Sequence, residues 1–193
     1  MDCGKVGRLI FSLRSEKRMT QKQLADALNI SDKTISKWER GLGCPDVTLL
    51  QELSGVLGVN IGQILSGDME ASGVDRGNLK KLKFYVCPVC GNTITSTSEP
   101  EISCCGRILT PLMPKQADEA HRITVEEFED ERYITSGHGM SKGHYISFIA
   151  AVDTDRVYLI KLYPEQDCAA RLPAVRGGKL FWYCTEHGLW TTG

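Results

Sequence analysis

Histidine and cysteine side chains that could bind a metal ion gather in the second half of this sequence. His138 and His144 lie in Gly-His-Gly-Met-Ser-Lys-Gly-His, and His187 follows Cys184 closely in Tyr-Cys-Thr-Glu-His-Gly-Leu-Trp. His121 is the remaining histidine of the chain. Imidazole nitrogen and thiolate sulfur are the ligands that borderline divalent metals prefer. One metal site would account for all four histidines, whereas any single one of them would more simply be a core or surface residue.

A second group consists of cysteines alone. Cys87 and Cys90 form a Cys-x-x-Cys-Gly knuckle, and the adjacent pair Cys104 and Cys105 follows. Four sulfur ligands in a tetrahedral arrangement suit either zinc or iron. Consecutive side chains diverge, so both members of the adjacent pair can bind one ion only in a distorted geometry. A structural zinc would instead hold together a short segment that has no core of its own.

Length and composition bound the classes of protein that this chain can represent. A chain of 193 residues can form one large domain or two to three small ones. A formal net charge of -1 excludes a uniformly basic nucleic-acid-binding surface but allows a local basic face. No apolar run approaches the roughly 18 residues that a membrane helix requires, and the N-terminus does not begin a secretory signal. We therefore expect a cytoplasmic protein with no membrane partner.

The expected compartment decides how the cysteines are interpreted. The chain contains eight cysteines, and in a reducing compartment they favour metal binding over disulfides. Cys3, Cys44 and Cys168 fall in no ligand-like pattern. We therefore expect these three to be ordinary free thiols, buried or partly exposed.

The first 66 residues show the periodicity of a helical bundle. Apolar residues recur at helical spacing in five successive segments, beginning near residues 6, 21, 32, 46 and 60. Thr20 and Gln23 form a capping box at the start of the second segment, and Ser31 caps the third. Two short helices joined by a tight turn make a helix-turn-helix, whose second helix enters the major groove of DNA.

The stretch TQKQLADALNISDKTISKWERG resembles the lambda-repressor-like (xenobiotic-response-element) family of helix-turn-helix domains, and the resemblance covers residues 5–66. It implies that Gln21 binds a DNA phosphate at the start of the second helix. It also implies base or phosphate contacts from Asp32, Lys33, Thr34 and Lys37. Ile35 and Trp38 are expected to face the core. The alternative is a helical module that binds another protein. Members of this family imply a homodimer on DNA half-sites roughly 34 Å apart.

The remainder of the chain is expected to be rich in β-strands. We place a helix-turn-helix domain at 1–66, a linker at 67–81, a small four-cysteine metal domain at 82–114 and a β-sandwich domain at 115–193. From His121 onward, short β-rich runs alternate with turns, and no helix-length amphipathic stretch interrupts them. We therefore predict a multidomain α + all-β chain that ends in an antiparallel sandwich of about seven strands.

Two further resemblances concern the metal sites. The segment around the four cysteines resembles the desulforedoxin domain, with its Phe-Tyr-x-Cys-x-x-Cys-Gly-Asn lead and Cys-Cys-Gly ending. The stretches HGMSKGHYISFI and YCTEHGLW resemble the superoxide reductase (desulfoferrodoxin) domain. The first resemblance implies a one-electron iron held by Cys87, Cys90, Cys104 and Cys105, with zinc as the alternative. The second implies an iron with an axial Cys184 thiolate and equatorial imidazoles from His121, His138, His144 and His187.

The superoxide reductase resemblance also implies a reaction. Four neutral imidazoles keep iron ferrous and leave one face open, and an axial thiolate donates electron density toward a bound oxygen species. Superoxide would accept one electron there and leave as peroxide, and an electron donor would restore the iron. Glu119 falls where the family has a glutamate that can take the sixth position. The family's lysine before the first histidine is Ala120 here, and Lys142 is a candidate substitute. Absence of that cation should weaken the steering of a superoxide anion toward the iron. The sequence therefore does not decide whether the protein is an active superoxide reductase.

These expectations lead to one preferred function and two alternatives. The preferred function is a transcriptional regulator that binds an operator in double-stranded DNA and senses superoxide, related oxidants or iron status through its C-terminal iron. The first alternative is a superoxide reductase enzyme, an oxidoreductase that carries an accessory DNA-binding domain. The second alternative has zinc at both sites, serving only folding or dimerisation.

Overall fold

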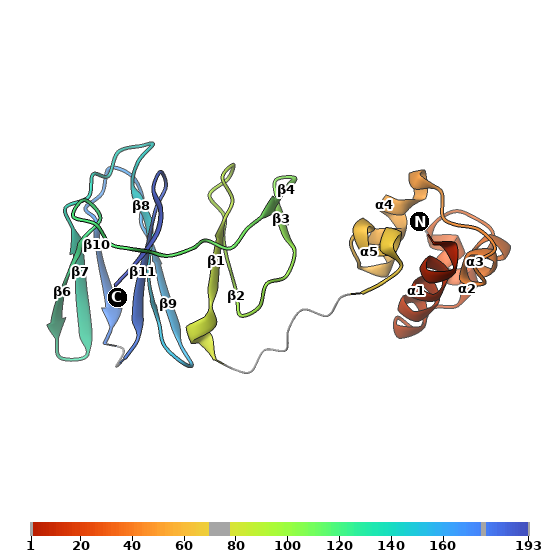
Figure 1. Cartoon of the computed structure of the whole chain (residues 1–193), viewed down its shortest axis with the longest axis horizontal. Helices are drawn as coiled ribbons and strands as arrows, with labels where there is room; N and C mark the ends of the chain where they lie inside the picture. The colour runs from red at the N-terminus through yellow and green to blue at the C-terminus, as the bar shows by residue number, and fades with distance from the viewer. Residues whose placement is uncertain (1, 70–77, 175–176, 193) are drawn as a thin grey trace. The chain divides into compact units, whose positions relative to one another are not determined.

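The structure, a computed structural model of the chain, contains a helical unit and a unit built from strands (Figure 1). It describes residues 2–69, 78–174 and 177–192. The chain divides into two units, residues 1–71 and residues 72–193. This division between helices and strands confirms the predicted α + all-β class. None of the described helices is long and apolar enough to cross a membrane.

Residues 2–69 form five α-helices, which confirms the predicted helical bundle. In chain order they are α1 (Cys3–Glu16), α2 (Gln21–Ala27), α3 (Asp32–Glu39), α4 (Leu50–Leu57) and α5 (Ile61–Ser66). The capping box at α2 is present, since the Thr20 hydroxyl accepts from the Gln23 amide and the Gln23 side chain accepts from the Thr20 amide. Ser31 caps α3 as predicted.

Two of the five helices begin at residues other than the predicted ones. The first starts earlier, at Cys3, because the Asp2 carboxylate caps it by accepting hydrogen bonds from amides of its first turn. The fourth starts later, at Leu50, because Asp46 instead caps a separate 3-10 turn, η1 (Val47–Leu49), by accepting from the Thr48 amide at 2.9 Å. A capping side chain thus marks the start of α1, whereas α4 follows η1 and has no side-chain cap of its own.

The core of the helical unit holds α3 against α1. Ile35 and Trp38 of α3 are buried, as predicted, together with Ile10 of α1. The two helices approach so closely at Gly7 that a Cβ atom there would lie 2.0 Å from the backbone oxygen of Trp38. Glycine at position 7 is therefore what allows this packing. The face of α3 that carries Ile35 and Trp38 is buried, which leaves its polar face on the surface.

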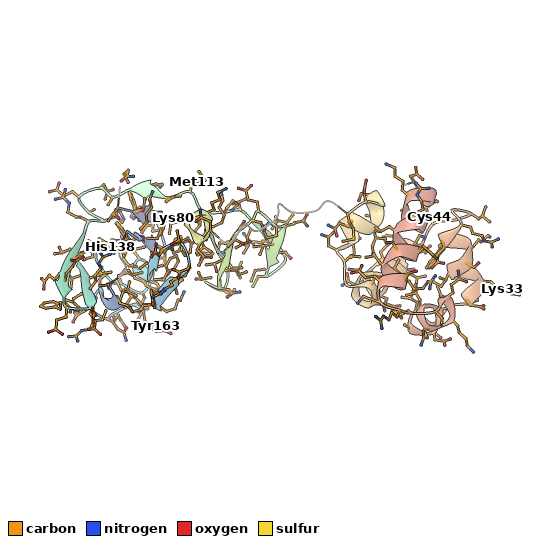
Figure 2. The ribbon with its side chains drawn as sticks, turned by 90° about the horizontal axis from the view of Figure 1, so that it is seen from below. Lys33, Cys44, Lys80, Met113, His138 and Tyr163 are labelled. Atoms are coloured by element: carbon orange, nitrogen blue, oxygen red, sulfur yellow. A yellow bond between two sulfur atoms is a disulfide. The ribbon has the colours of Figure 1, made fainter. Side chains whose placement is uncertain are left out.

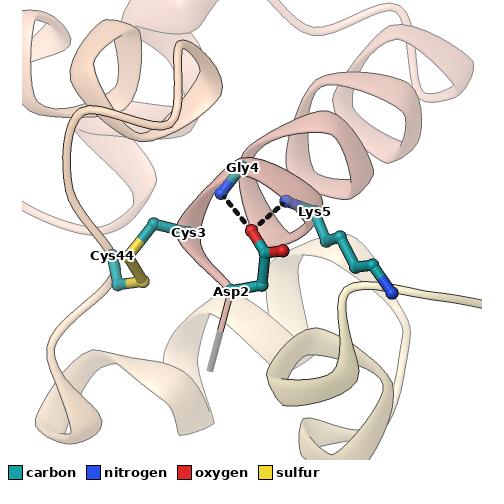
Figure 3. Close-up of a disulfide and its surroundings, with 5 residues drawn as sticks. All are labelled: Asp2, Cys3, Gly4, Lys5 and Cys44. Carbon is teal, nitrogen blue, oxygen red and sulfur yellow. Dashed lines mark hydrogen bonds between the residues drawn. A yellow bond between two sulfur atoms is a disulfide. The ribbon is translucent and has the colours of Figure 1, made fainter.

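A disulfide joins Cys3 to Cys44, and the expectation that both are free thiols is wrong (Figure 3). The bond connects the first residue of α1 to the loop that follows α3, across a sequence separation of 41. The two segments meet at glycines, because a Cβ atom on Gly41 would lie 3.0 Å from the Cα of Gly4. Closing a loop of this size stabilises the folded chain by about 4 kcal/mol in the loop-entropy account. Cys168 is free and buried, as expected.

The four-cysteine segment consists of two small antiparallel hairpins (Figure 1). The first pairs β1 (Lys83–Val86) with β2 (Thr93–Ser96), and the second pairs β3 (Ile102–Cys104) with β4 (Arg107–Leu109). Tyr85 and Leu109 form its small core. Residues 70–77 of the predicted linker lie outside the described residues. Its described end, η2 (Leu79–Lys81), contacts the strand-rich unit, where the Leu79 amide donates to the Thr154 carbonyl at 3.0 Å.

Two further sheets form the predicted sandwich. The larger has the order β5-β12-β11-β8-β9 and the smaller the order β10-β7-β6. Their bounds are β5 (Lys115–Gln116), β6 (Ile123–Phe128), β7 (Glu131–Ser136), β8 (Ile146–Val152), β9 (Val157–Lys161), β10 (Ala169–Pro173), β11 (Lys179–Cys184) and β12 (Gly188–Thr191). Every pairing in these sheets is antiparallel except that of β5 with β12. The sandwich is therefore confirmed, with one parallel edge pair added.

Strand β8 lies at the centre of this unit and is buried along its whole length. Ile149 and Ala151 contribute to the core between the two sheets. Phe148 and Ala150 belong to a second core, which continues into the four-cysteine segment. There the rings of Phe84 on β1 and Phe148 stack with their centroids 5.4 Å apart. An apolar run buried on both faces explains why this stretch does not alternate between apolar and polar residues.

Candidate functional site

The structure brings together the five side chains that the second resemblance assigns to one metal. One ligand atom from each of these residues lies within 4.8 Å of all the others: His121, His138, His144, Cys184 and His187. His121 precedes β6, His138 and His144 lie on the loop between β7 and β8, Cys184 ends β11, and His187 precedes β12. Figure 2 marks His138 within the sandwich. Residues from three separate segments therefore converge at one end of the sheets.

Hydrogen bonds to backbone carbonyls hold these segments together. The indole of Trp182 on β11 donates to the carbonyl of His121 at 2.9 Å, and this bond is buried. The Thr185 amide donates to the Tyr145 carbonyl at 3.0 Å, which joins the two loops that follow Cys184 and precede β8. A register shift between Tyr183 and Cys184 interrupts the pairing of β11 with β8 at the cluster. Such irregularities re-aim side chains near functional sites.

Three ring nitrogens of the cluster lack a hydrogen-bond partner in the part of the chain that the structure describes. Both ring nitrogens of His138 and Nε2 of His144 are buried with no hydrogen-bond partner. His121 Nε2 lies 3.1 Å from His187 Nδ1, which in turn lies 3.5 Å from Cys184 Sγ. Buried polar atoms in folded proteins are nearly always paired. An ion bound among these atoms would supply the missing partner.

Burial also sets the protonation state that a metal requires. Desolvation lowers the pKa of His138 below its usual value, and repulsion from the neighbouring histidines adds to this effect. The neutral imidazole is the form that binds a metal ion. The environment of His138 therefore favours the ligand form.

Asp118 is a partner of one candidate ligand that the sequence reasoning missed. Its Oδ1 lies 2.6 Å from His121 Nδ1 and also accepts from the His121 amide at 2.9 Å. The hydrogen bond with the His121 side chain holds the pKa of Asp118 below its usual value. The Trp190 ring stacks on the His121 ring, with the two ring centroids 4.1 Å apart. A carboxylate on Nδ1 leaves Nε2 free for a metal, and the Asp-x-x-His spacing was the signal for it.

We expect Asp118→Asn to weaken metal binding by roughly 10- to 100-fold, because the amide no longer fixes the tautomer and orientation of His121 as a carboxylate does. Chelator competition, followed by metal analysis, measures the change. Asp155→Asn is the matched control, since Asp155 is an exposed carboxylate whose ion pair is with Arg156. Equal metal affinities for the two variants would contradict this role of Asp118.

The two residues assigned catalytic roles lie on the surface. Glu119 is exposed in the turn before His121 and is not part of the five-residue cluster. The side chain of Lys142 is 81% exposed, and its Nζ lies 3.9 Å from Glu165 Oε1. A different lysine contacts the cluster. Lys115 Nζ donates to the carbonyl of His187 at 3.0 Å and lies 5.4 Å from the ring centroid of Trp190. No local pattern in the sequence indicated Lys115.

The four cysteines of the first hairpins also converge. Their four Sγ atoms all lie within 4.8 Å of one another, and Cys90 Sγ is 3.6 Å from Cys104 Sγ. The adjacent Cys104 and Cys105 can both face this point because Cys105 adopts a positive φ of 49°. Backbone amides of Cys90 and Val89 lower the pKa of Cys87 to about 6.

The remaining thiols of this group oppose further ionisation. Hydrogen bonds with Cys90 and Cys87 raise the pKa of Cys105 to about 12, and the pKa of Cys104 is raised by the same neighbours. Several thiolates cannot lie this close together unless a cation neutralises them. The donor set therefore fits a metal that prefers sulfur, which zinc and iron both do.

The polar face of α3 borders a shallow hollow of about 520 Å³ on the helical unit. Four of the predicted DNA-binding residues line it: Gln21, Asp32, Lys33 and Lys37. Ser36 and Arg40 also line it and were missed by the sequence reasoning, although both occupy the polar face of the same helix. Figure 2 shows Lys33 at the outer edge of the unit.

Two predicted DNA contacts have partners within the protein. The side-chain Nε2 of Gln21 donates to Glu39 Oε2 at 2.7 Å, and Arg14 Nε pairs with Glu39 Oε1 at 2.6 Å. Thr34 is partly buried, and its hydroxyl lies 2.9 Å from that of Ser31. Thr34 therefore contributes to the start of α3 and does not line the hollow.

Comparisons with known proteins agree with this division. Residues 10–64 match the family model HTH_3, described as helix-turn-helix. The HTH-type transcriptional activator BcrR of Enterococcus faecalis is 42% identical over 77 residues, which are 38% of this chain and 38% of BcrR. The desulfoferrodoxin of Desulfarculus baarsii is 27% identical over 121 residues, which are 58% of this chain and 95% of that protein.

The superoxide reductase of Treponema pallidum is similar in structure, with a TM-score of 0.51 and 17% identity over 58% of this chain and 98% of that one. At this identity the similarity shows the fold. The chain therefore combines a helix-turn-helix domain with a unit of superoxide reductase-like fold. It spans 38% of the length of BcrR, so the activity of that regulator does not transfer as a whole.

Proposed function

We propose that this chain, in which a helix-turn-helix domain is joined to a unit of superoxide reductase-like fold, is a DNA-binding transcriptional regulator. Its C-terminal metal centre would sense superoxide, related oxidants or iron status. The observation that carries the proposal is the presence of both parts on one chain: an exposed polar helix face and a cluster of five convergent metal ligands. The match to a protein named a transcriptional activator supports the first part.

The DNA-binding step rests on α3. Its buried side is anchored by Trp38, so the exposed lysines Lys33 and Lys37 are presented from a fixed helix. Lysine side chains neutralise DNA phosphates and release counterions on binding. We infer a homodimer on an operator with half-sites about 34 Å apart, because a helix in the major groove repeats with the helical turn of DNA.

The sensing step rests on the five-ligand centre. We propose that the resident metal is iron, which when bound supplies one electron to a small oxidant. Cys184 and the four histidines would hold it, and Asp118 would orient His121. Lys115 would attract an anion toward this end of the sheets, in place of the cation lost at Ala120. Glu119 would be a further carboxylate available to the metal, and the four-cysteine site is the proposed source of a second electron.

Loss or oxidation of the metal would change the chain locally before it changes DNA binding. Without an ion, the buried nitrogens of His138 and His144 have no partner, and unpaired buried polar groups cost about 1–3 kcal/mol each. The loop that carries both histidines would relax to reach water. In a dimer this relaxation would alter how the two DNA-binding domains are held, which is the proposed signal.

Operator affinity in three metal states tests the proposal. A duplex selected from a random library by the full-length protein serves as the probe, and fluorescence anisotropy measures its affinity for ferrous, oxidised and metal-free protein. We expect at least one pair of states to differ about tenfold, within the usual range of allosteric coupling. Lys33→Ala with Lys37→Ala is the control and should weaken binding in every state and reduce its salt dependence. Identical affinities in all three states would refute the proposal that the metal centre controls DNA binding.

A second candidate is a superoxide reductase enzyme with an accessory DNA-binding domain. The observation that favours it is the complete five-ligand cluster with a cation, Lys115, hydrogen-bonded to the backbone of one ligand residue. Rapid consumption of superoxide by the ferrous protein, unchanged in the double lysine variant of α3, would support the enzyme. Metal analysis comes first, because zinc at both sites with no visible absorption would exclude the enzyme and the oxidant-sensing part of the regulator.

A further inference from the structure

We propose that Cys3 and Cys44 form a peroxide-responsive dithiol, and that its oxidation fastens the loop after α3 to the start of α1. The inference rests on the proposed function only for the source of the peroxide, which is the product expected when superoxide is reduced. It adds a second redox site, located in the DNA-binding domain itself.

The backbone of the helical unit places the two cysteines within bonding distance. Their Cα atoms lie 4.9 Å apart, inside the range of roughly 4.4–6.8 Å that disulfides require. The packing beside them is also close, since a Cβ atom on Gly41 would lie 3.0 Å from the Cα of Gly4. Helix and loop therefore meet through backbone contacts that do not depend on the bond. We infer that the reduced thiols stay adjacent and that the bond can form and break without unfolding.

This pair differs from the other cysteines of the described chain. Five of the others belong to the two metal clusters. Cys168 is 6% exposed, and burial raises the pKa of its thiol to about 11, which keeps it protonated and unreactive. Cys3 and Cys44 are both only partly buried, so a small oxidant reaches them. A soluble peroxide would therefore act on this pair and spare Cys168.

The disulfide lies beside the hollow that the polar face of α3 borders. Arg40 and Leu42 line that hollow, and Cys44 follows Leu42 in the same loop. The loop is otherwise tied to α3 by hydrogen bonds from the Gly41 amide to Trp38 and from the Leu42 amide to Lys37, at 2.8 and 3.0 Å. The disulfide adds an attachment on the far side of Leu42. An ordered loop lowers the entropy lost on binding, so the oxidised form should bind DNA more tightly.

The oxidation balances with peroxide as the only added reagent. One cysteine thiolate attacks a peroxide oxygen, the O–O bond breaks, and a sulfenic acid forms with release of one water after proton transfer. The second thiol attacks that sulfur, forms the S–S bond and releases a second water. Two thiols thus lose two electrons and two protons to one hydrogen peroxide, which yields two waters. A dithiol reductant reverses the reaction by thiol–disulfide exchange.

Differential alkylation of the full-length protein tests the chemistry. Protein reduced with a phosphine is exposed to hydrogen peroxide, alkylated, and analysed by peptide mass spectrometry. We expect Cys3 and Cys44 to be alkylated before peroxide and protected after it, with recovery on reduction. Cys168→Ala should behave as wild type, and Cys44→Ser should leave Cys3 unable to form this bond. Full alkylation of both cysteines after peroxide would overturn the inference.

Operator affinity tests the consequence. Using the library-selected duplex, we expect disulfide-bonded wild type to bind roughly 3- to 10-fold more tightly than reduced wild type at one fixed iron state, and this difference to vanish in Cys44→Ser. Equal affinities of the two wild-type forms would overturn the inference. A response to iron oxidation that persists in Cys44→Ser belongs to the metal centre instead. Bond formation by added peroxide but not during superoxide turnover would reject the proposed source while leaving the dithiol intact.

Discussion

Replacing His138 with leucine is expected to abolish metal binding at the cluster of five candidate ligands without destabilising the metal-free protein. His138 is 8% exposed and neither ring nitrogen has a hydrogen-bond partner. Removing a ligand should lower metal affinity by more than about 100-fold, since even outer partners of ligands contribute 10- to 100-fold. Leucine also removes two unpaired polar atoms, so the metal-free protein should gain up to about 1–2 kcal/mol in free energy of unfolding.

Metal analysis after chelator titration and urea unfolding of metal-free protein measure the two effects. Thr191→Val is the matched control, because Thr191 is also buried but its hydroxyl donates to the Leu180 carbonyl at 2.9 Å. That variant should lose about 1 kcal/mol in free energy of unfolding with or without metal and keep its metal affinity. If His138→Leu instead destabilised the metal-free protein and retained metal, His138 would be a structural residue of the sandwich.

Replacing Gly7 with alanine should destabilise the helical unit by about 3 kcal/mol or more. The added Cβ would lie 2.0 Å from the backbone oxygen of Trp38, and a backbone atom cannot turn away as a flexible side chain can. α1 would have to move away from α3. We therefore also expect weaker DNA binding, because the position of α3 depends on that contact.

Gly55→Ala is the control for this change. Gly55 lies exposed on α4, and a Cβ atom there meets nothing within 4 Å. Alanine should therefore raise the free energy of unfolding by about 0.5–1 kcal/mol through its higher helix propensity. Far-ultraviolet circular dichroism during urea unfolding reports on this unit, since the described α-helices all lie in it. Similar effects of the two substitutions would contradict the close contact at Gly7.

Local patterns in the sequence were enough to predict the helical bundle and to group the candidate metal ligands. The capping box at Thr20 and the cap at Ser31 act within one helical turn, so their residue types mark helix starts directly. The helix-turn-helix motif is local for the same reason. The two ligand groups are rare residue types in family-like spacing, which is why they were identified although they come from separate strands and loops.

Contacts between distant segments were decided by the tertiary structure alone. Cys3 meets Cys44 because glycines let α1 and the loop after α3 pack backbone to backbone, and neither cysteine lies in a local motif. Lys115 reaches the His187 carbonyl because β5 pairs in parallel with β12. Asp118, by contrast, is a local partner of His121, and the Asp-x-x-His spacing alone could have indicated it. Side-chain type and local spacing name the candidates, whereas the packing of elements far apart in the chain determines which of them meet.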